Sequence, residues 1–380
     1  MDFSFTSFLT ILFFSSVVII FMCLILKSSR LIKHIGVSIL SVCLMAIIIR
    51  LFLPYEFTFA KELGLSGIYS EFVFFLKVPL AEIAGHTINL YESFYLVIFL
   101  GILVNFIKTI VSYKRFERVI CSLPDITNQK INYILHIILK DYKRKIPFII
   151  KESPLVSTPM IFRITKPLII LPEIDLSEDE WYYILKHEVA HYYRGDLHIK
   201  IITELLAIIY WWNPFIYLLK KQISKILEIR IDVAITHSLS EIEKIKYIEC
   251  LLKIAKNQIS HKQKKVALSF GSDECNTISQ RSHIVLDDYP ALSKFKYLVL
   301  IVPLILVILS YSFVFEPYSI NSKDQSYTVE LTTSNSYLVE NPNGGYDLYF
   351  DDKYFGTVTL IKDSYSNLPV YKNIKEAPKK

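Results

Sequence analysis

The chain has 380 residues, of which 52% are hydrophobic, and its mean hydropathy is +0.38. This apolar fraction exceeds the ~45–50% typical of soluble domains, which argues against an ordinary soluble protein and directs attention to membrane spans first. The formal net charge is +6, but the basic residues form no stripe interleaved with aromatic residues, so direct nucleic acid binding is not expected.

Four apolar runs predict membrane-spanning helices and a mainly α, integral-membrane fold class. They are residues 3–26, 35–54, 93–111 and 297–315. The first run carries no charge over 24 residues. At ~1.5 Å per residue it exceeds a hydrocarbon core of ~30 Å. No basic segment precedes it and no small-residue cleavage site follows, so we interpret it as a retained span, not a signal peptide.

The short loops predict the orientation, because Lys and Arg are retained on the cytoplasmic side. Residues 27–34 and 112–118 are rich in Lys and Arg, whereas residues 55–92 contain more Glu than Lys. We expect a multi-pass protein of a bacterial-type cell membrane with both termini outside. The expected parts are three spans in 1–111 with an extracellular loop at 55–92, a cytoplasmic segment 112–296, a fourth span 297–315 and an extracellular tail 316–380.

The cytoplasmic segment is expected to combine a small β-sheet with helices. Apolar runs punctuated by prolines, at 147–150, 159–164 and 167–172, predict the strands. Ser177 followed by Glu180 has the pattern of a capping box, so a helix is expected to begin there, continue through His191 and end near Gly195.

The next stretch, residues 199–219, is apolar enough to resemble a fifth span. Asn213 and Pro214 interrupt it and leave halves of about ten residues, or ~15 Å of helix, which is half a bilayer. We therefore predict a buried or membrane-apposed helical hairpin.

His187 and His191 lie four residues apart in the sequence His-Glu-Val-Ala-His and would share one face of a helix. Two imidazoles at this spacing can bind one Zn²⁺, and Glu188 can act as the general base toward a zinc-activated water. The pattern therefore predicts a zinc site with His187 and His191 as ligands and Glu188 as the catalytic residue. The alternative interpretation is a helix with two solvated or capped histidines.

A hydrolytic zinc needs a third protein ligand. Glu228 is the best candidate, and Asp232, four residues later, can accept a hydrogen bond from a ligand histidine and so orient it. If residues 199–219 crossed the bilayer once, Glu228 would lie opposite the histidines, so this ligand also requires the hairpin. The alternative is an exposed ion-pair face without a metal.

For other polar residues near the motif, the sequence does not decide between several roles. Asp196 and His198 can bind metal or orient a ligand, and Asp196 can equally cap its helix. Four residues are equal candidates for stabilising an oxyanion: Tyr192, Tyr193, Arg281 and His283.

Together these elements resemble the BlaR/MecR family of membrane zinc peptidases, over residues 140–260. The resemblance rests on Ser157 to Phe162 with Pro167 to Pro172, His187-Glu188-x-x-His191-Tyr192, Arg194-Gly195-Asp196, Trp212-Asn213-Pro214 and Glu228-x-x-x-Asp232. It implies an α+β gluzincin-type domain with Glu228 as the third zinc ligand. It also implies site-specific proteolysis in the cytoplasm, switched on by an extracellular signal, with self-cleavage and a BlaI/MecI-like transcriptional repressor as substrate.

Two features depart from that family. Ile231 stands where the family commonly has Cys, which alters packing more than chemistry. The tail, residues 316–380, contains no Ser-x-x-Lys, so covalent capture of a β-lactam by this chain is not expected. Alternating residues at 326–331 and 346–350, with turns at 343–344 and 351–352, predict a small β-sheet there.

The sequence thus favours a signal-transducing zinc metalloendopeptidase. Its expected partners are the lipid bilayer, a cytoplasmic protein substrate and an unknown extracellular ligand, and a homodimer is one option for its assembly. Two alternatives remain: a non-proteolytic membrane sensor or immunity protein with a structural zinc, and a membrane quality-control protease that cuts many substrates.

Overall fold

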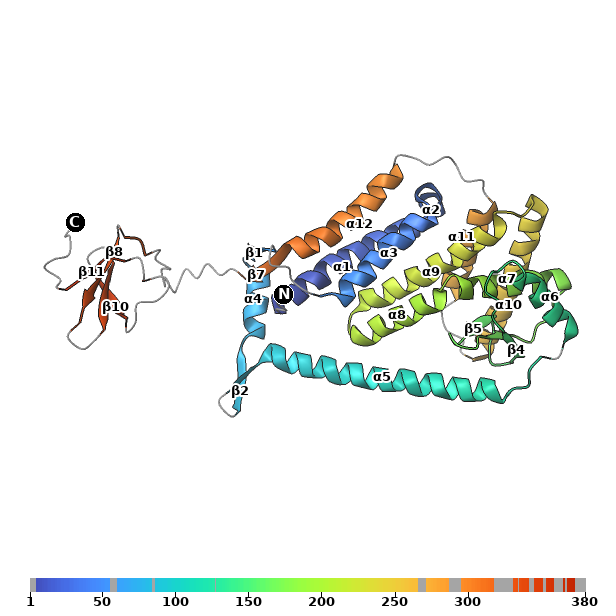
Figure 1. Cartoon of the computed structure of the whole chain (residues 1–380), viewed down its shortest axis with the longest axis horizontal. Helices are drawn as coiled ribbons and strands as arrows, with labels where there is room; N and C mark the ends of the chain where they lie inside the picture. Colours follow the sequence, from blue (N-terminus) through green and yellow to red (C-terminus); the bar gives the residue numbers. More distant parts are fainter. Residues whose placement is uncertain are drawn as a thin grey trace. The chain divides into compact units, whose positions relative to one another are not determined.

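The computed structural model describes residues 5–54, 60–83, 86–126, 128–265, 271–286 and 295–317, with shorter C-terminal stretches at 331–333, 335–341, 345–350, 353–358, 365 and 368–372. The chain divides into two compact units, Met1–Ser319 and Ile320–Lys380. Helices dominate the first unit and small sheets occur in both, which confirms a mainly helical class with small sheets (Figure 1).

Apolar helices form much of the first unit. They are α1 (Phe5–Leu26), α2 (Ser29–Ile35), α3 (Val37–Phe52), α5 (Leu90–Ser122) and α12 (Phe295–Ser312). Of these, α1 and α5 are long and apolar enough to cross a membrane, and α2 with α3 qualify as a pair that is bent by 93°. The apolar stretch Ile301–Ser312 within α12 is shorter. The described helices thus offer two candidate spans, or three with the bent pair, and the four-span topology stays a prediction.

One end of the first unit gathers segments that are distant in sequence. It contains β1 (Lys61–Leu65), α4 (Ile68–Leu76) and β7 (Phe313–Pro317), with β1 and β7 paired in parallel. The hairpin of β2 (Pro79–Ile83) and β3 (His86–Asn89) leads from α4 into α5. The backbone N–H of Phe315 donates to Thr10 Oγ1 of α1 at 3.0 Å. The start of α1 and the end of α12 therefore lie together, at what we call the β1–β7 end.

A buried arginine joins α3 to α12. Arg50 Nε donates to Ser310 Oγ and Arg50 Nη2 to the Ser310 carbonyl, each at 2.7 Å. The guanidinium also lies 3.8 Å from the centroid of the Tyr311 ring. Because a buried cation needs such partners, these contacts fix α12 along α3.

A three-stranded sheet lies against the last turns of α5. Its order is β4 (Ile149–Glu152), β6 (Leu168–Leu171), β5 (Met160–Phe162), with β4 parallel and β5 antiparallel to β6. The predicted small sheet is therefore confirmed, with β5 at its edge among the described residues. Arg163, next to β5, pairs with Glu117 of α5 at 2.7 Å, and Phe162 contacts the Phe116 ring. The edge strand is thus tied to α5.

Six helices complete the first unit. They are α6 (Gln129–Leu139), α7 (Glu178–Tyr193), α8 (Asp196–Ile209), α9 (Pro214–Thr236), α10 (Glu241–Lys265) and α11 (Gly271–Leu286). The predicted start of α7 is confirmed, because Ser177 and Glu180 form a capping box. The predicted end is confirmed as well: Gly195, at φ 75°, adopts the left-handed conformation that glycine favours and lets the chain turn into α8.

The predicted helical hairpin is formed by α8 and α9. Asn213 caps α9 by accepting a hydrogen bond from the Phe215 N–H, and Pro214 occupies its first turn. The two helices, of 14 and 23 residues, are longer than the predicted halves. The hairpin therefore reaches further than expected: at its tip the Tyr210 hydroxyl donates to the Leu51 carbonyl at the end of α3, at 2.8 Å.

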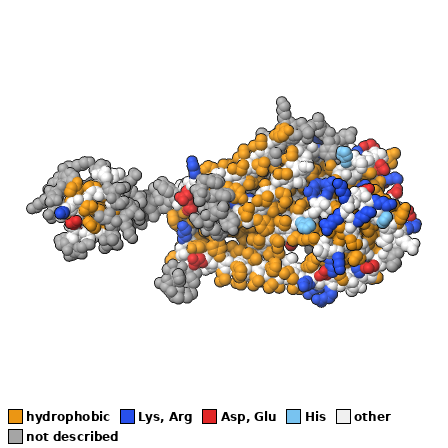
Figure 2. Space-filling view, in the orientation of Figure 1, with side chains coloured by type: hydrophobic (Ala, Val, Ile, Leu, Met, Phe, Trp, Pro, Cys, Tyr) orange, Lys and Arg blue, Asp and Glu red, His pale blue; other side chains and the backbone are white. Residues whose placement is uncertain are grey.

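Helix α9 belongs to two hydrophobic cores. Its residues from Ile216 to Ile229 pack in one cluster with α1, α2, α3 and α8. Ile231 and Ile235 pack in a second cluster with α6, α7, α10 and the sheet. Figure 2 shows hydrophobic side chains over the region of α3, α8 and α9, and Lys and Arg gathered toward α7, α10 and α11. A single helix thus runs from the apolar part of the unit into the polar part.

The second unit contains a four-stranded sheet. Its order is β10 (Lys353–Val358), β9 (Tyr346–Phe350), β8 (Ser336–Glu340), β11 (Val370–Tyr371). Leu338, Leu348 and Leu368 form a small core on it. Of the predicted features, the strand at 346–350 is present, whereas residues 326–330 and the turns at 343–344 and 351–352 lie outside the described residues.

Candidate metal centre

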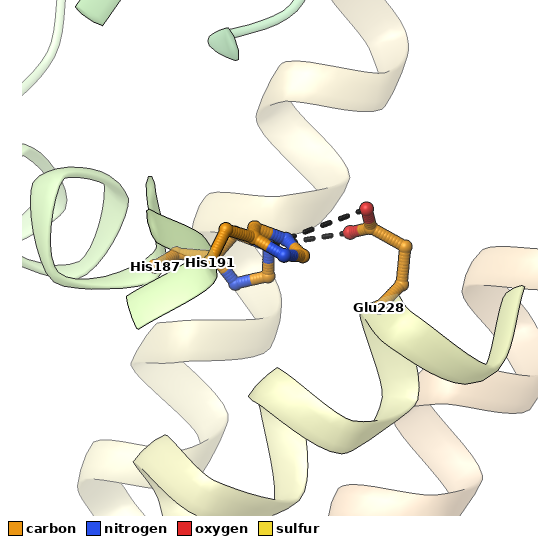
Figure 3. A group of neighbouring side chains, drawn as sticks. All are labelled: His187, His191 and Glu228. Atoms are coloured by element: carbon orange, nitrogen blue, oxygen red, sulfur yellow. Dashed lines mark hydrogen bonds and ion pairs between the residues drawn. The ribbon is translucent and has the colours of Figure 1, made fainter. Parts of the chain in front are cut away.

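Three potential metal ligands converge between α7 and α9. His187 and His191 lie one turn apart on α7, and Glu228 faces them from α9 (Figure 3). Their ligand atoms all lie within 4.8 Å of one another. The structure thus brings together the three residues that the sequence predicted as ligands.

The distances between the three candidate ligand atoms are close to those around a tetrahedral metal. His187 Nε2 lies 3.0 Å from His191 Nε2 and 3.2 Å from Glu228 Oε2, and His191 Nε2 lies 3.4 Å from Glu228 Oε1. Ligand atoms around a tetrahedral zinc, with bonds of about 2.0–2.2 Å, lie about 3.3–3.6 Å apart. Two imidazoles with one carboxylate are also a donor set typical of catalytic zinc, which leaves a fourth position open.

Asp196 forms a hydrogen bond with His191 on the side of the ring that faces away from Glu228. Its Oδ2 lies 2.6 Å from His191 Nδ1, and its other oxygen pairs with Arg230 of α9. Asp196 is fully buried in the first turn of α8. Of the three roles left open for Asp196, the structure favours that of orienting a candidate ligand histidine.

Asp232 does not bond directly to a histidine, contrary to the prediction. Its Oδ1 lies 3.7 Å from His187 Nδ1, beyond hydrogen-bonding distance. The hydroxyl of Tyr247 lies between them, 2.6 Å from Asp232 Oδ1 and 2.9 Å from His187 Nδ1. Sequence reasoning missed Tyr247, because nothing in the sequence around it marks it as part of the site.

Arg281 forms a two-fold ion pair with Asp232. Its Nε and Nη2 lie 2.6 and 2.8 Å from the two oxygens of that carboxylate, and its Nη1 lies 3.5 Å from Glu228 Oε2. Of the four oxyanion candidates, Arg281 is the one placed at the site. The Tyr192 and Tyr193 hydroxyls donate to the carbonyls of Ile164 and Arg144, and the side chain of His283 is exposed.

The electrostatics of the site favour a bound cation. Burial raises the pKa of Glu228, but hydrogen bonds with His187 and His191 outweigh this effect and hold the pKa well below its usual 4.5. Burial lowers the pKa of His191, but its hydrogen bonds to Asp196 and Glu228 raise it to about 9. Because these carboxylates favour positive charge on His191, a bound metal cation would take the place of that proton.

Glu188 lines a cavity of about 390 Å³ together with the three ligands. Residues Thr158 to Ile161 of the β5 segment form one wall, and Leu251 and Ile254 of α10 form another. Lys200 of α8 also lines the cavity, with its Nζ 3.9 Å from Glu228 Oε1. His198 is not part of the ligand cluster. The cavity therefore places a carboxylate, a metal site and a strand edge side by side.

Residues 77–285, more than half of the chain, match the family described as BlaR1 peptidase M56. The chain belongs to the M56 peptidase family. This confirms the BlaR/MecR resemblance, because the family takes its description from BlaR1. The residues of the candidate metal centre all lie inside the matched range.

Curated M56 relatives are similar over part of their length. The regulatory protein BlaR1 of Bacillus licheniformis is 31% identical over 164 residues, which are 43% of this chain and 27% of the relative. The methicillin resistance mecR1 protein of Staphylococcus aureus is 30% identical over 138 residues, 35% of this chain and 23% of the relative. The chain thus spans about a quarter of the length of these relatives.

Proposed function

We propose that this M56 peptidase is a membrane-embedded zinc metalloendopeptidase that transduces an extracellular signal by cutting a cytoplasmic protein. The observation that carries the proposal is the convergence of His187, His191 and Glu228 at a cavity that Glu188 also lines. The names of the relatives, a regulatory protein and a methicillin resistance protein, support roles in signalling and antibiotic resistance.

The proposed mechanism assigns one role to each residue. His187, His191 and Glu228 hold one Zn²⁺, which when bound supplies a Lewis acid and lowers the pKa of a water. Glu188 takes a proton from the attacking water and passes it to the nitrogen of the leaving group. Asp196 and Asp232 keep the ligand histidines in position, the latter through Tyr247.

We assign oxyanion stabilisation to Arg281. Its Nε and Nη2 are fixed by Asp232, so the remaining nitrogen, Nη1, is held at the cavity wall beside Glu228. A fixed positive charge at that wall stabilises the negative charge that develops on the substrate carbonyl oxygen.

The substrate is proposed to bind as an extended peptide. Among the described residues, β5 is an edge strand of its sheet and lies beside the cavity, and an extended chain can pair with such an edge. Leu251 and Ile254 offer an apolar surface for one substrate side chain. Binding along a strand does not require a free chain end, which favours an endopeptidase.

The proposed topology places both termini outside and residues 112–296, with the metal centre, in the cytoplasm. The meeting of the start of α1 with the end of α12 supports termini on one side of the bilayer. On this topology the substrate is a BlaI/MecI-like transcriptional repressor, and the signal is an unidentified extracellular ligand. A homodimer is compatible with this arrangement.

The test compares the full chain with two variants, all reconstituted with zinc in lipid nanodiscs. Each is incubated with a purified BlaI/MecI-type repressor and with a cytosolic extract, and new N-termini are identified by mass spectrometry. We expect Glu188→Gln to keep its zinc content and lose at least about 10²-fold in cleavage rate. The matched control, Glu173→Gln, removes an exposed carboxylate outside the site and should cut like the parent.

The outcomes separate the competing functions. Cleavage at the parental rate by Glu188→Gln would remove the proposed mechanism. A parent that binds zinc but creates no new N-termini, its own included, would favour the non-proteolytic sensor or immunity protein. Cuts in many unrelated extract proteins would favour a quality-control protease instead of a signalling enzyme.

A further inference from the structure

The two ligand histidines are held in different ways. His191 Nδ1 reaches a carboxylate directly, at 2.6 Å from Asp196 Oδ2. His187 Nδ1 reaches its carboxylate, Asp232, only through the hydroxyl of Tyr247. A single phenol oxygen thus completes the support of one metal ligand.

The donor and the acceptor of each hydrogen bond around this hydroxyl can be assigned. Both oxygens of Asp232 accept from the guanidinium of Arg281, and Oδ1 also accepts from the Tyr247 O–H at 2.6 Å. Because the tyrosine has a single proton, its oxygen can only accept from His187 Nδ1, 2.9 Å away. Nδ1 of His187 is therefore held as a proton donor, which leaves Nε2, the nitrogen that faces Glu228 at 3.2 Å, as the atom that would bind a metal.

Tyr247 is itself held firmly. The residue is 1% exposed, and its ring packs in the cluster of α7 and α10, with the Tyr183 ring centroid 5.8 Å away. Asp232 is fully buried. The hydroxyl position is therefore fixed by packing, and loss of this hydroxyl would leave a gap of 3.7 Å that a direct bond cannot close.

We propose that Tyr247 is a positioning residue that fixes the tautomer and the orientation of His187 for metal binding. The inference rests on the proposed function to the extent that the three ligands bind zinc. It extends the site to α10, a helix that contributes none of the three candidate ligands His187, His191 and Glu228.

The test is the affinity of the full chain for zinc in detergent or nanodiscs, measured by competition with a fluorescent chelator. Tyr247→Phe removes only the hydroxyl, and we expect zinc affinity to fall about 10- to 100-fold, the usual effect of losing a group that supports a ligand. The visible spectrum of bound Co²⁺ should change as well, because it reports the geometry around the metal.

The matched control is Tyr193→Phe. Tyr193 also lies on a helix of this core and donates its hydroxyl proton to a backbone carbonyl, that of Arg144, but does not touch a ligand. We expect this variant to keep the parental zinc affinity and Co²⁺ spectrum. Equal losses in both variants, or none in Tyr247→Phe, would overturn the inference.

A second variant guards against a folding defect. Asp232→Asn weakens the acceptor of the same hydroxyl without changing the packing of the ring. Asp232 also holds Arg281, but its path to His187 passes through Tyr247, so the combined loss of zinc affinity in Asp232→Asn with Tyr247→Phe should be smaller than the sum of the two single losses. The losses of Asp196→Asn and Tyr247→Phe should instead add. Additive losses for the first pair would contradict the inference. Absence of zinc binding by the parent would instead contradict the proposed function.

Discussion

The indole of Trp211 packs directly against the backbone of α5 at Gly101, in the space that the side chain of any other residue at position 101 would occupy. A Cβ at Gly101 would lie 2.2 Å from a carbon of the Trp211 ring. The indole N–H donates to the Ile98 carbonyl of the same helix at 3.3 Å. The tip of the α8–α9 hairpin therefore packs against α5, through Trp211, as well as against α3, through Tyr210.

The first prediction concerns this contact. In a helix, Gly→Ala normally stabilises by up to about 1 kcal/mol. We expect Gly101→Ala to lower the melting temperature of the full chain in detergent, because the methyl group displaces the Trp211 ring. Gly356→Ala is the control, since a Cβ there meets no atom within 4 Å. A Gly101→Ala variant that melts higher than the parent would contradict the seating of the hairpin.

The second prediction concerns Asp196. Asp196→Asn keeps the shape of the side chain but removes the charge that His191 Nδ1 and Arg230 share. We expect zinc affinity to fall about 10- to 100-fold. Asp175→Asn, an exposed carboxylate, should leave it unchanged. Chelator competition measures both, and an unchanged affinity in Asp196→Asn would mean that this carboxylate does not support the metal.

The third prediction is a pH dependence of the metal-free protein. Burial lowers the pKa of His191, but the hydrogen bonds of its ring to Asp196 and Glu228 outweigh burial and raise the pKa from 6.5 to about 9. The proton thus stabilises the metal-free fold fully below pH 6.5, and this contribution is lost as the pH rises through 9. Zinc displaces the proton, so its apparent affinity should rise about tenfold per pH unit over this range. An affinity that does not change with pH would contradict the assigned pKa.

The fourth prediction concerns membrane orientation, and Cys121 is its reporter. Cys121 is exposed, Cys43 and Cys250 are buried, and burial raises the pKa of the Cys250 thiol to about 12, which makes it unreactive near neutral pH. In a Cys275→Ser background, a membrane-impermeant maleimide should label Cys121 only after spheroplasts are permeabilised.

The control for this labelling is a cysteine in the second unit. Lys353→Cys lies on an exposed position of β10 and should react in intact spheroplasts. Labelling of Cys121 in intact cells, with protection of the cysteine at 353, would reverse the proposed orientation.

Local sequence patterns predicted the features that depend on a few neighbouring residues. The capping box at Ser177, the turn at Gly195 and the break at Asn213 are set by backbone conformation and short-range hydrogen bonds. The two histidines of the candidate metal centre could be predicted for the same reason, because their spacing matches one helical turn. Glu228 required one further argument, that the chain must double back to reach them.

Contacts between distant segments could not be predicted in this way. Tyr247 lies 60 residues from His187, and a lone tyrosine on a helix face carries no sign that its hydroxyl meets a metal ligand. The parallel pairing of β1 with β7 joins segments separated by most of the chain. The length of the hairpin was underestimated, since α9 continues through Glu228 without a break.

The unbroken course of α9 has a practical consequence for isolating the peptidase. The same helix packs against α1 and α3 near Ile216 and supplies Glu228 and Asp232 twelve and sixteen residues later. The chain therefore cannot be cut within α9 without separating Glu228 from the part of the helix that packs against α1 and α3. A truncation that removes α1 and α3 would take away the packing that positions α9 and Glu228, so the activity should be measured in the intact chain, in lipid or detergent.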